Sequence, residues 1–228
     1  MKICCISDLH GNLPILESGD LLLIAGDITA DNKVKNWMKF FEWLEKQNYK
    51  KKIVIAGNHD NFLENACTTK KGKELGLHEE IISGYEYLCD NFTIFEGLKI
   101  YGTPWTKWFH GINPHCKAFT KNSERQLEGI YSLIPTDTNI LITHNPPYGI
   151  FDHFKEWGDG EVIYTGSYSL KNIVENIKPK IHLFGHIHEH GEKTFTKIYD
   201  AGKETIYINA SIMNPKYEPV NKPIYITI

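Results

Sequence analysis

Short apolar runs that end in polar residues recur along this chain and constrain its fold more than any other feature. Five such runs are KICCIS, LLLIAG, IVIAG, ILIT and IHLFG. Continuous apolar runs of about four to six residues are typical of strands that are buried on both faces. Each run is followed by Asp, Asn or His, in the segments Asp8-Leu9-His10, Asp27, Asn58-His59-Asp60, His144-Asn145 and His186-Ile187-His188. The pattern predicts buried strands whose carboxyl ends carry polar side chains.

Helical patterns lie between these runs. Residues 34–47 place Val34, Trp37, Met38, Phe41 and Leu44 at helical spacing. Residues 123–134 open with a capping box formed by Ser123 and Gln126 and then carry one apolar stripe. A shorter helix is expected over 170–177, before Pro179. Strands that alternate with helices predict an α/β fold, and the runs ETIYIN and KPIYITI predict further, antiparallel strands in the tail.

Length and charge exclude several classes of protein. The 228 residues suit one domain, which we expect to span 1–228, and the formal net charge is -3. No basic stretch extends beyond Lys50-Lys51-Lys52, so we expect no extended nucleic-acid surface. No run has the length of a signal peptide or a membrane span, and the five cysteines lack CxxC spacing. We therefore expect a cytoplasmic protein without a membrane partner.

The polar residues at the strand ends predict a metal centre. Carboxyl ends of strands are where α/β sheets bind ligands. Carboxylate, imidazole and amide donors without thiolates suit Mn, Fe, Zn or similar divalent ions. Seven donors are too many for one tetrahedral centre but suit two centres that share a carboxylate, and such a pair can clamp a phosphoryl group and activate water. The seven are Asp8, His10, Asp27, Asn58, His144, His186 and His188.

The order of these motifs resembles the calcineurin-like metallophosphoesterase superfamily. Its D-x-H, GD, GNH[D/E], H and GHxH blocks are present in order between residues 3 and 188. The segments YGTPW, THNPPYG, KPKIHLFGHIHE and INAS are similar to its metallophosphoesterase-domain-containing branch. The resemblance implies a β-sandwich of mixed sheets flanked by helices, with the active site at the carboxyl ends of the strands.

The resemblance also implies a role for each motif residue. Asp8, His10 and His188 would hold one metal, and Asn58, His144 and His186 the other, with Asp27 bridging them. His59 would face the substrate with Asn58 and act on the phosphoryl group and the leaving group. Asp60 would support catalysis by binding His59 or a nearby backbone group. The implied cofactors are two divalent ions, with Mn preferred and Fe, Zn, Ni or Mg as alternatives.

Three features depart from the superfamily pattern or lie outside it. Many members carry GDxxDRG, but Ile28-Thr29-Ala30-Asp31 follows Asp27 here, which leaves open what orients His59. His190, the third histidine of FGHIHEHG, lies outside the motif, and we do not expect it to bind metal. In the aromatic segment 102–111 we expect Trp105 in the core, while Trp108 and Phe109 could line the substrate site or the core. Trp108 is retained as a candidate substrate contact.

These residues favour a dinuclear phosphoesterase that hydrolyses phosphodiesters, including cyclic nucleotides or small nucleotide diesters. A promiscuous phosphomonoesterase is the alternative within this class. A non-catalytic binding scaffold is the alternative outside it, and loss of His59 or of a ligand would mark that case; neither is lost. The expected partner is a small phosphate ester. The sequence does not predict the physiological substrate, the metal identity or the oligomeric state.

Overall fold

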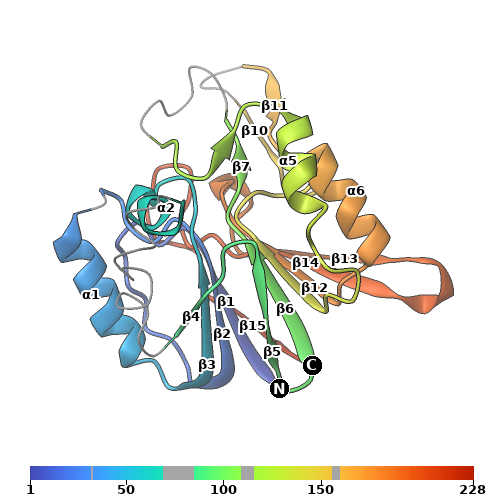
Figure 1. Ribbon diagram of the computed structural model, residues 1–228. Coiled ribbons are helices and arrows are strands. Elements are labelled where there is room, and N and C mark those ends of the chain that lie inside the picture. Colours follow the sequence, from blue (N-terminus) through green and yellow to red (C-terminus); the bar gives the residue numbers. More distant parts are fainter. Residues whose placement is uncertain (32, 69–84, 109–115, 156–159) are drawn as a thin grey trace.

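Two β-sheets form the centre of the protein (Figure 1). The structure is a computed structural model, and it describes residues 1–31, 33–68, 85–108, 116–155 and 160–228. The first sheet has the order β15-β1-β2-β3-β4. Strands β1 to β4 are parallel, and β15 pairs antiparallel with β1. The strands are β1 (Lys2–Ile6), β2 (Gly19–Ala25), β3 (Tyr49–Ile55), β4 (Glu86–Tyr87) and β15 (Ile224–Thr227).

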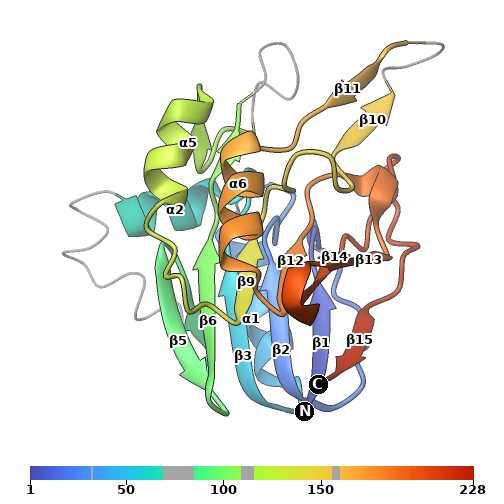
Figure 2. The same ribbon diagram turned by 90° about the vertical axis from the view of Figure 1, so that its right-hand side faces the viewer.

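The second sheet has the order β13-β14-β12-β9-β6-β5, with four parallel central strands and antiparallel edges. Its strands are β5 (Asn91–Phe95), β6 (Leu98–Thr103), β9 (Ile140–Thr143), β12 (Ile181–Phe184), β13 (Lys193–Ile198) and β14 (Glu204–Asn209). Two short pairs are separate from it: β7 (Thr106–Lys107) with β8 (Thr120–Lys121), and β10 (His153–Lys155) with β11 (Val162–Tyr164). Figure 2 shows the β10–β11 hairpin at the end of the molecule opposite the termini.

The two sheets pack face to face through alternate side chains of their strands. Cys5 and Leu23 of the first sheet share a buried cluster with Ile142 and Leu183 of the second. Cys4 points the other way, into a cluster with helix α1. Because successive side chains of a strand alternate between faces, one run of apolar residues supplies both layers.

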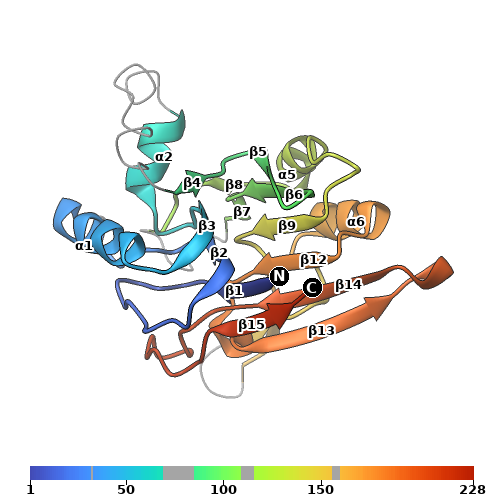
Figure 3. The same cartoon turned by 90° about the horizontal axis from the view of Figure 1, so that it is seen from below.

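Helices cover the outer face of each sheet (Figure 3). Trp37 and Leu44 of α1 (Val34–Glu45) pack on the first sheet, and α2 (Asn61–Thr68) adds Leu63. Helices α5 (Glu124–Tyr131) and α6 (Tyr168–Ile177) pack on the second, and two 3₁₀ turns, η1 (His188–His190) and η2 (Asp200–Gly202), flank β13. The predicted sandwich of mixed sheets flanked by helices is confirmed. No helix in these described ranges is both long and apolar enough to cross a membrane.

The predicted helices form, with two corrections. The predicted N-cap is present, since Ser123 Oγ accepts the Gln126 N–H at 3.4 Å, while the Gln126 side chain accepts from Asn122 N–H at 3.1 Å and not from Ser123 N–H. The predicted stripe of the first helix was partly wrong, because Val34 and Met38 are 63% and 53% exposed while Phe40 is buried. Met38 follows Trp37 directly and therefore points about 100° away from it around the helix. Helix α2 was not predicted, because it begins directly after the GNHD motif and that segment was interpreted only as part of the motif.

His182 is held neutral inside the second sheet. The Thr143 hydroxyl donates to the Asn145 carbonyl at 2.6 Å, so its oxygen accepts from Nε2–H of His182 at 2.9 Å. The other ring nitrogen, Nδ1, is buried without a partner among the described residues. Burial lowers the pKa of His182 to about 3. A proton on Nδ1 would place an unpaired charge in the core.

We expect His182 to make the fold sensitive to acid. Below pH 6.5 the unfolded chain binds a proton that the folded chain excludes, so stability falls from pH 6.5 towards the folded pKa of about 3. This contribution approaches about 1.4 kcal/mol per pH unit. His182→Gln keeps a donor near Thr143 but does not titrate. Urea unfolding of both proteins between pH 7 and 4 should therefore show a flatter profile for the variant, and parallel profiles would contradict this account.

Candidate metal centre

The carboxyl ends of the parallel strands from both sheets meet at one place. The backbone N–H of Ser7, after β1, donates to the carbonyl of Ala210, after β14, at 2.8 Å. The carbonyl of Ala25 accepts from the Ser7 hydroxyl at 2.9 Å and from Nδ1–H of His144 at 2.8 Å. The Ser7–Ala210 and His144–Ala25 bonds run between the sheets, and the Ser7–Ala25 bond joins neighbouring strands of the first sheet. Together they hold the polar segments behind β1, β2 and β9 against one another.

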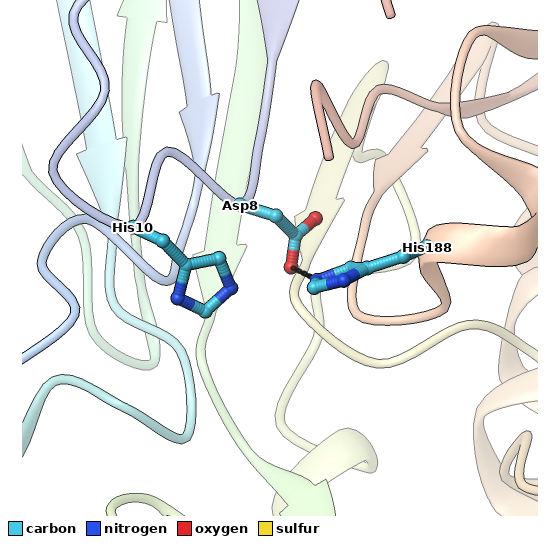
Figure 4. A group of neighbouring side chains, drawn as sticks. All are labelled: Asp8, His10 and His188. Carbon is cyan, nitrogen blue, oxygen red and sulfur yellow. Dashed lines mark ion pairs between the residues drawn. The ribbon is translucent and has the colours of Figure 1, made fainter. Parts of the chain in front are cut away.

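One set of side chains, the first ligand group, consists of Asp8, His10 and His188 (Figure 4). Each offers one ligand atom, and these atoms all lie within 4.8 Å of one another. Nε2 of His188 is 3.4 Å from Oδ1 of Asp8. Nε2 of His10 is buried and has no hydrogen-bond partner among the described residues. Such an unpaired nitrogen costs free energy unless a ligand binds it.

A second ligand group consists of Asp27, His144 and His186, with the same spacing limit of 4.8 Å. The bond from Nδ1–H of His144 to Ala25 directs Nε2 towards the centre, where it can donate an electron pair to a metal after losing its proton. That nitrogen lies 3.3 Å from Oδ2 of Asp27 and 3.0 Å from Oδ1 of Asn58. The amide of Asn58 is therefore positioned beside the second group, and all seven predicted ligand residues come together.

Asp27 lies between the two groups, and its carboxylate forms a third set of close donor atoms with His10 and His59. Its Oδ2 faces Nε2 of His10 at 3.7 Å and Nε2 of His144 at 3.3 Å. Its Oδ1 accepts the backbone N–H of His59 at 2.9 Å, and the His59 ring nitrogen Nε2 lies 3.9 Å from Oδ2. A carboxylate in this position has the geometry that a bridging ligand needs.

Four residues at the centre have a left-handed backbone conformation, which residues other than glycine rarely adopt. Asp8, His10, Asp27 and His186 have φ values of 54°, 42°, 52° and 70°. Asp and His tolerate the left-handed region better than most residues, although it still carries strain. The loops behind β1 and β2 hold each other, because Asp8 N–H donates to Gly26 and His10 N–H donates to the Asp27 carbonyl, both at 2.9 Å.

Two motif glycines allow the loops to approach this closely. A Cβ atom on Gly57 would lie 2.2 Å from Oδ1 of Asp27, and one on Gly185 would lie 2.2 Å from Oδ2 of Asp8. Both distances are far below van der Waals contact. The glycines of GNHD and GHxH are therefore required by the position of the two carboxylates.

Asp60 binds backbone amides. Its carboxylate accepts from Gly57 N–H at 2.8 Å, Ile28 N–H at 3.0 Å and Thr29 N–H at 3.4 Å. Asp60 is fully buried and ties the loop behind β2 to the loop behind β3. These contacts match the backbone alternative of the two roles expected for Asp60, so we regard it as a positioning residue and not as a group that touches substrate.

Burial and charge set the protonation of the centre. Burial would raise the pKa of Asp8, but the hydrogen bond and charge of His188 outweigh it and lower that pKa to about 2. Burial would lower the pKa of His144, but the charge of Asp27 outweighs it and raises that pKa to about 9. Burial lowers the pKa of His186 to about 3 and that of His10 to about 4. Ionised carboxylates and neutral imidazoles are the forms that bind metal, so His144 must release its proton when an ion binds.

The calcineurin-like phosphoesterase family model matches residues 1–190. The chain belongs to this family. It is 33% identical to human metallophosphoesterase domain-containing protein 1 over 100% of this chain and 71% of that protein. A UPF0046 protein of Caenorhabditis elegans is 34% identical, with 100% of this chain and 81% of that protein covered. The family and its metallophosphoesterase-domain-containing branch, both expected from the motifs, are thus confirmed.

A solved structure supports the fold alone. Phosphopantetheinyl hydrolase from Mycobacterium tuberculosis superimposes with a TM-score of 0.60 at 13% identity, covering 99% of this chain and 95% of that one. The family's requirement for divalent metals fits the residues of this calcineurin-like chain. The unpaired Nε2 of His10 and the two ligand groups provide donor atoms of suitable type and spacing.

The third histidine of FGHIHEHG has partners of its own. Nε2–H of His190 donates to the His153 carbonyl at 2.9 Å, and its Nδ1 accepts from the Lys193 ammonium at 3.0 Å. Both ring nitrogens therefore have hydrogen-bond partners, and that His190 is not a ligand stays a prediction.

The aromatic segment is only partly described. Nε1–H of Trp105 donates to Asp90 at 2.7 Å, and its ring packs on Phe119 within the core. The half-buried Trp108 ring lies 5.1 Å from the Lys117 ammonium, and its role as a substrate contact stays a prediction. Phe109 lies outside the described residues.

Sequence reasoning missed two side chains that contact the centre. The Tyr217 ring lies 5.0 Å from that of His10 and 4.8 Å from that of His188, measured between centroids. Sγ of Cys116 lies 3.3 Å from Nδ1 of His59. Neither residue belongs to a motif, and both are far from their partners in sequence, so no spacing signal could have indicated them.

We expect metal content to separate the three roles assigned here. Asp27→Ala should lose both ions, because it removes the shared carboxylate. His188→Ala should lose one ion, because only the first ligand group is broken. Elemental analysis of Mn-saturated protein after gel filtration measures both losses.

His190→Ala is the matched control, because it removes an imidazole two residues away whose nitrogens bind other groups. It should retain the metal content of the unaltered protein. Full retention by Asp27→Ala would refute the bridging assignment, and loss of an ion by His190→Ala would refute the division of the histidine cluster.

Proposed function

We propose that this chain is a phosphoesterase that uses two divalent ions to hydrolyse phosphodiesters, including cyclic nucleotides or small nucleotide diesters. The observation that carries the proposal is the meeting of two ligand groups at Asp27. Asp8, His10 and His188 would hold one ion, and Asn58, His144 and His186 the other. When bound, the ions would neutralise phosphoryl oxygens and supply a nucleophile from water at neutral pH.

His59 is the residue proposed to act on the reacting group. Its side chain is 14% exposed to solvent, whereas the side chain of the neighbouring Asp27 is 3% exposed. A substrate that enters from solvent can therefore reach the His59 ring. Its ring meets the His10 ring edge-on, with 4.6 Å between centroids. From this position Nε2–H can donate to a phosphoryl oxygen or to the departing alkoxide, which stabilises charge that develops in the transition state.

A pocket beside His10 supports a substrate with a second ester group. It has a volume of about 200 Å³ and is lined by His10, Asp31, Asn36, Lys39 and Phe40 among others. The Asn36 amide donates to the Asp31 carboxylate at 2.6 Å, which leaves the Lys39 ammonium as the cation of this pocket. A diester carries two substituents on phosphorus, and this pocket offers room and a cation for one of them. A monoester would leave it empty, so the pocket favours the diester over the monoester alternative.

The finer assignments are proposals of the same kind. We propose Mn as the preferred metal, with Fe, Zn, Ni or Mg as alternatives, because the donors are imidazole and oxygen. A small phosphate ester is the proposed partner, since the chain has no long basic stretch. A cytoplasmic location is proposed from the free thiols of Cys4, Cys5, Cys89 and Cys116.

The substrate proposal is tested by a matrix of metals and model esters. Protein loaded with Mn, Fe, Ni, Zn or Mg should hydrolyse bis-p-nitrophenyl phosphate and cyclic nucleotides at least as well as p-nitrophenyl phosphate. A preference for the monoester of about tenfold in kcat/KM, or 1.4 kcal/mol in the barrier, would favour the monoesterase. Absence of turnover with every metal would favour the non-catalytic scaffold.

His59→Asn should lower kcat by about 10²–10⁴-fold, the usual range for loss of a positioned proton donor. Metal content should stay unchanged, because the two proposed ligand sets are complete without the His59 imidazole, although its donor atom lies within 4.8 Å of those of His10 and Asp27. The loss should be smaller for p-nitrophenyl esters than for alkyl esters, since p-nitrophenolate needs little protonation. A uniform loss across leaving groups, or loss of metal, would contradict the assigned role.

A further inference from the structure

The residue that orients His59 is the part of the site that the motifs leave open. The segment behind Asp27 is Ile28-Thr29-Ala30-Asp31, with Ala30 at the position where many superfamily members carry the second aspartate of GDxxDRG. Asp60 is bound to the backbone amides of Gly57 and Ile28. The ring nitrogen Nδ1 of His59 instead faces Sγ of Cys116 at 3.3 Å, within hydrogen-bonding distance for sulfur.

We infer that Cys116 is a positioning residue for His59. Its S–H donates to Nδ1, fixes the ring plane and keeps the ring proton on Nε2, the nitrogen that faces the metal centre. The inference rests on the proposed function for its catalytic consequence, but the contact itself does not. It assigns to a thiol the task that a carboxylate performs in proteins with the longer motif.

The direction of this hydrogen bond follows from the chemistry of the two groups. A thiol has one proton to donate, and a neutral imidazole has one nitrogen that accepts. Burial raises the pKa of the Cys116 thiol to about 11, so it carries its proton at neutral pH. With Nδ1 accepting, Nε2 must hold the hydrogen of the neutral ring. That hydrogen is the one that a departing alkoxide requires.

The backbone holds the thiol in place. Two residues after Cys116, the backbone N–H of Ala118 donates to the Asn58 carbonyl at 3.1 Å. The next amide, that of Phe119, donates to Oε1 of Glu64 on α2 at 2.8 Å. Ala118 and Phe119 are fully buried. The segment that carries Cys116 is therefore attached to the same loop that carries His59, so the two side chains keep a fixed relation.

A thiol also differs from a carboxylate in charge. Asp8, Asp27 and Asp60 already place three buried carboxyl groups in and beside the centre. A further carboxylate beside His59 would add repulsion to this set, whereas a neutral thiol supplies direction without charge. Cys116→Ser should preserve this property, because a hydroxyl is also a neutral donor.

The tautomer of His59 can be measured without turnover. Protein labelled with ¹⁵N-histidine and loaded with diamagnetic Zn²⁺ gives long-range ¹H–¹⁵N spectra that distinguish the two tautomers, and His59→Gln assigns the resonance. The unaltered protein and Cys116→Ser should show Nε2–H at His59. Cys116→Ala should show a mixture or the Nδ1–H form. An unchanged tautomer in Cys116→Ala would overturn the inference, whatever the activity.

Kinetics supply the second readout. Cys116→Ala should lower kcat by about 10- to 100-fold, the range for partners that orient an imidazole. KM and metal content should stay constant, and Cys116→Ser should restore most of kcat. In a His59→Asn background, Cys116→Ala should have no further effect, because the thiol acts only through that ring. Cys89→Ala is the control for a half-buried cysteine elsewhere and should leave kcat unchanged.

The outcomes separate this inference from the proposed function. An equal loss in the His59→Asn background, or a fall in metal content, would show a merely structural role for Cys116 and overturn the inference. If the protein is inactive but the His59 tautomer changes in Cys116→Ala, the proposed enzyme function is refuted and the positioning role of Cys116 stands. If the protein is active but neither the His59 tautomer nor kcat changes in Cys116→Ala, the proposed enzyme function stands and the positioning role of Cys116 is refuted.

Discussion

The buried carboxylate of Asp27 is the constraint around which the rest of the site is arranged. A carboxylate with 2% exposure is costly to bury unless charges and hydrogen bonds compensate for it. The compensation comes from the loop behind β3, through His59 N–H, and from β9 in the other sheet, through the His144 ring. Because the compensating groups belong to both sheets, the electrostatics of one side chain and the docking of the two layers depend on each other.

Polar residues of the motifs divide into those that face the centre and those that hold it together. Gly57, Gly185 and Asp60 contribute no donor atom to either ligand group, yet they set how closely the loops approach. The glycines are required because a side chain would not fit, and Asp60 is required because it binds backbone amides. These positions therefore tolerate as few substitutions as the ligand positions do. A motif such as GNHD therefore combines a turn, a metal ligand, a substrate-facing ring and a backbone anchor in four consecutive residues.

The sequence predicted those features that depend on local pattern. Buried strands, their polar carboxyl ends, the N-cap at Ser123 and the spatial meeting of Asp8 with His188 all follow from periodicity and motif order. The rotation of α1 did not, because several apolar stripes were compatible with the sequence and packing selected Phe40. Cys116 and Tyr217 did not, because their contacts join segments distant in the chain and depend on loop paths that no propensity describes.

The left-handed backbone at Asp8, His10, Asp27 and His186 lowers the stability of the fold, although the side chains at these positions are needed for the metal centre. Each such residue carries strain of about 1–3 kcal/mol relative to a relaxed conformation, and glycine would not. None of these four side chains belongs to the apolar clusters that form the core of the sandwich. Selection for chemistry must therefore retain them against a standing thermodynamic preference for their loss. A descendant released from that selection could replace them and keep, or improve, the stability of its fold, so a well-folded relative with an eroded centre is the expected evolutionary by-product of this architecture.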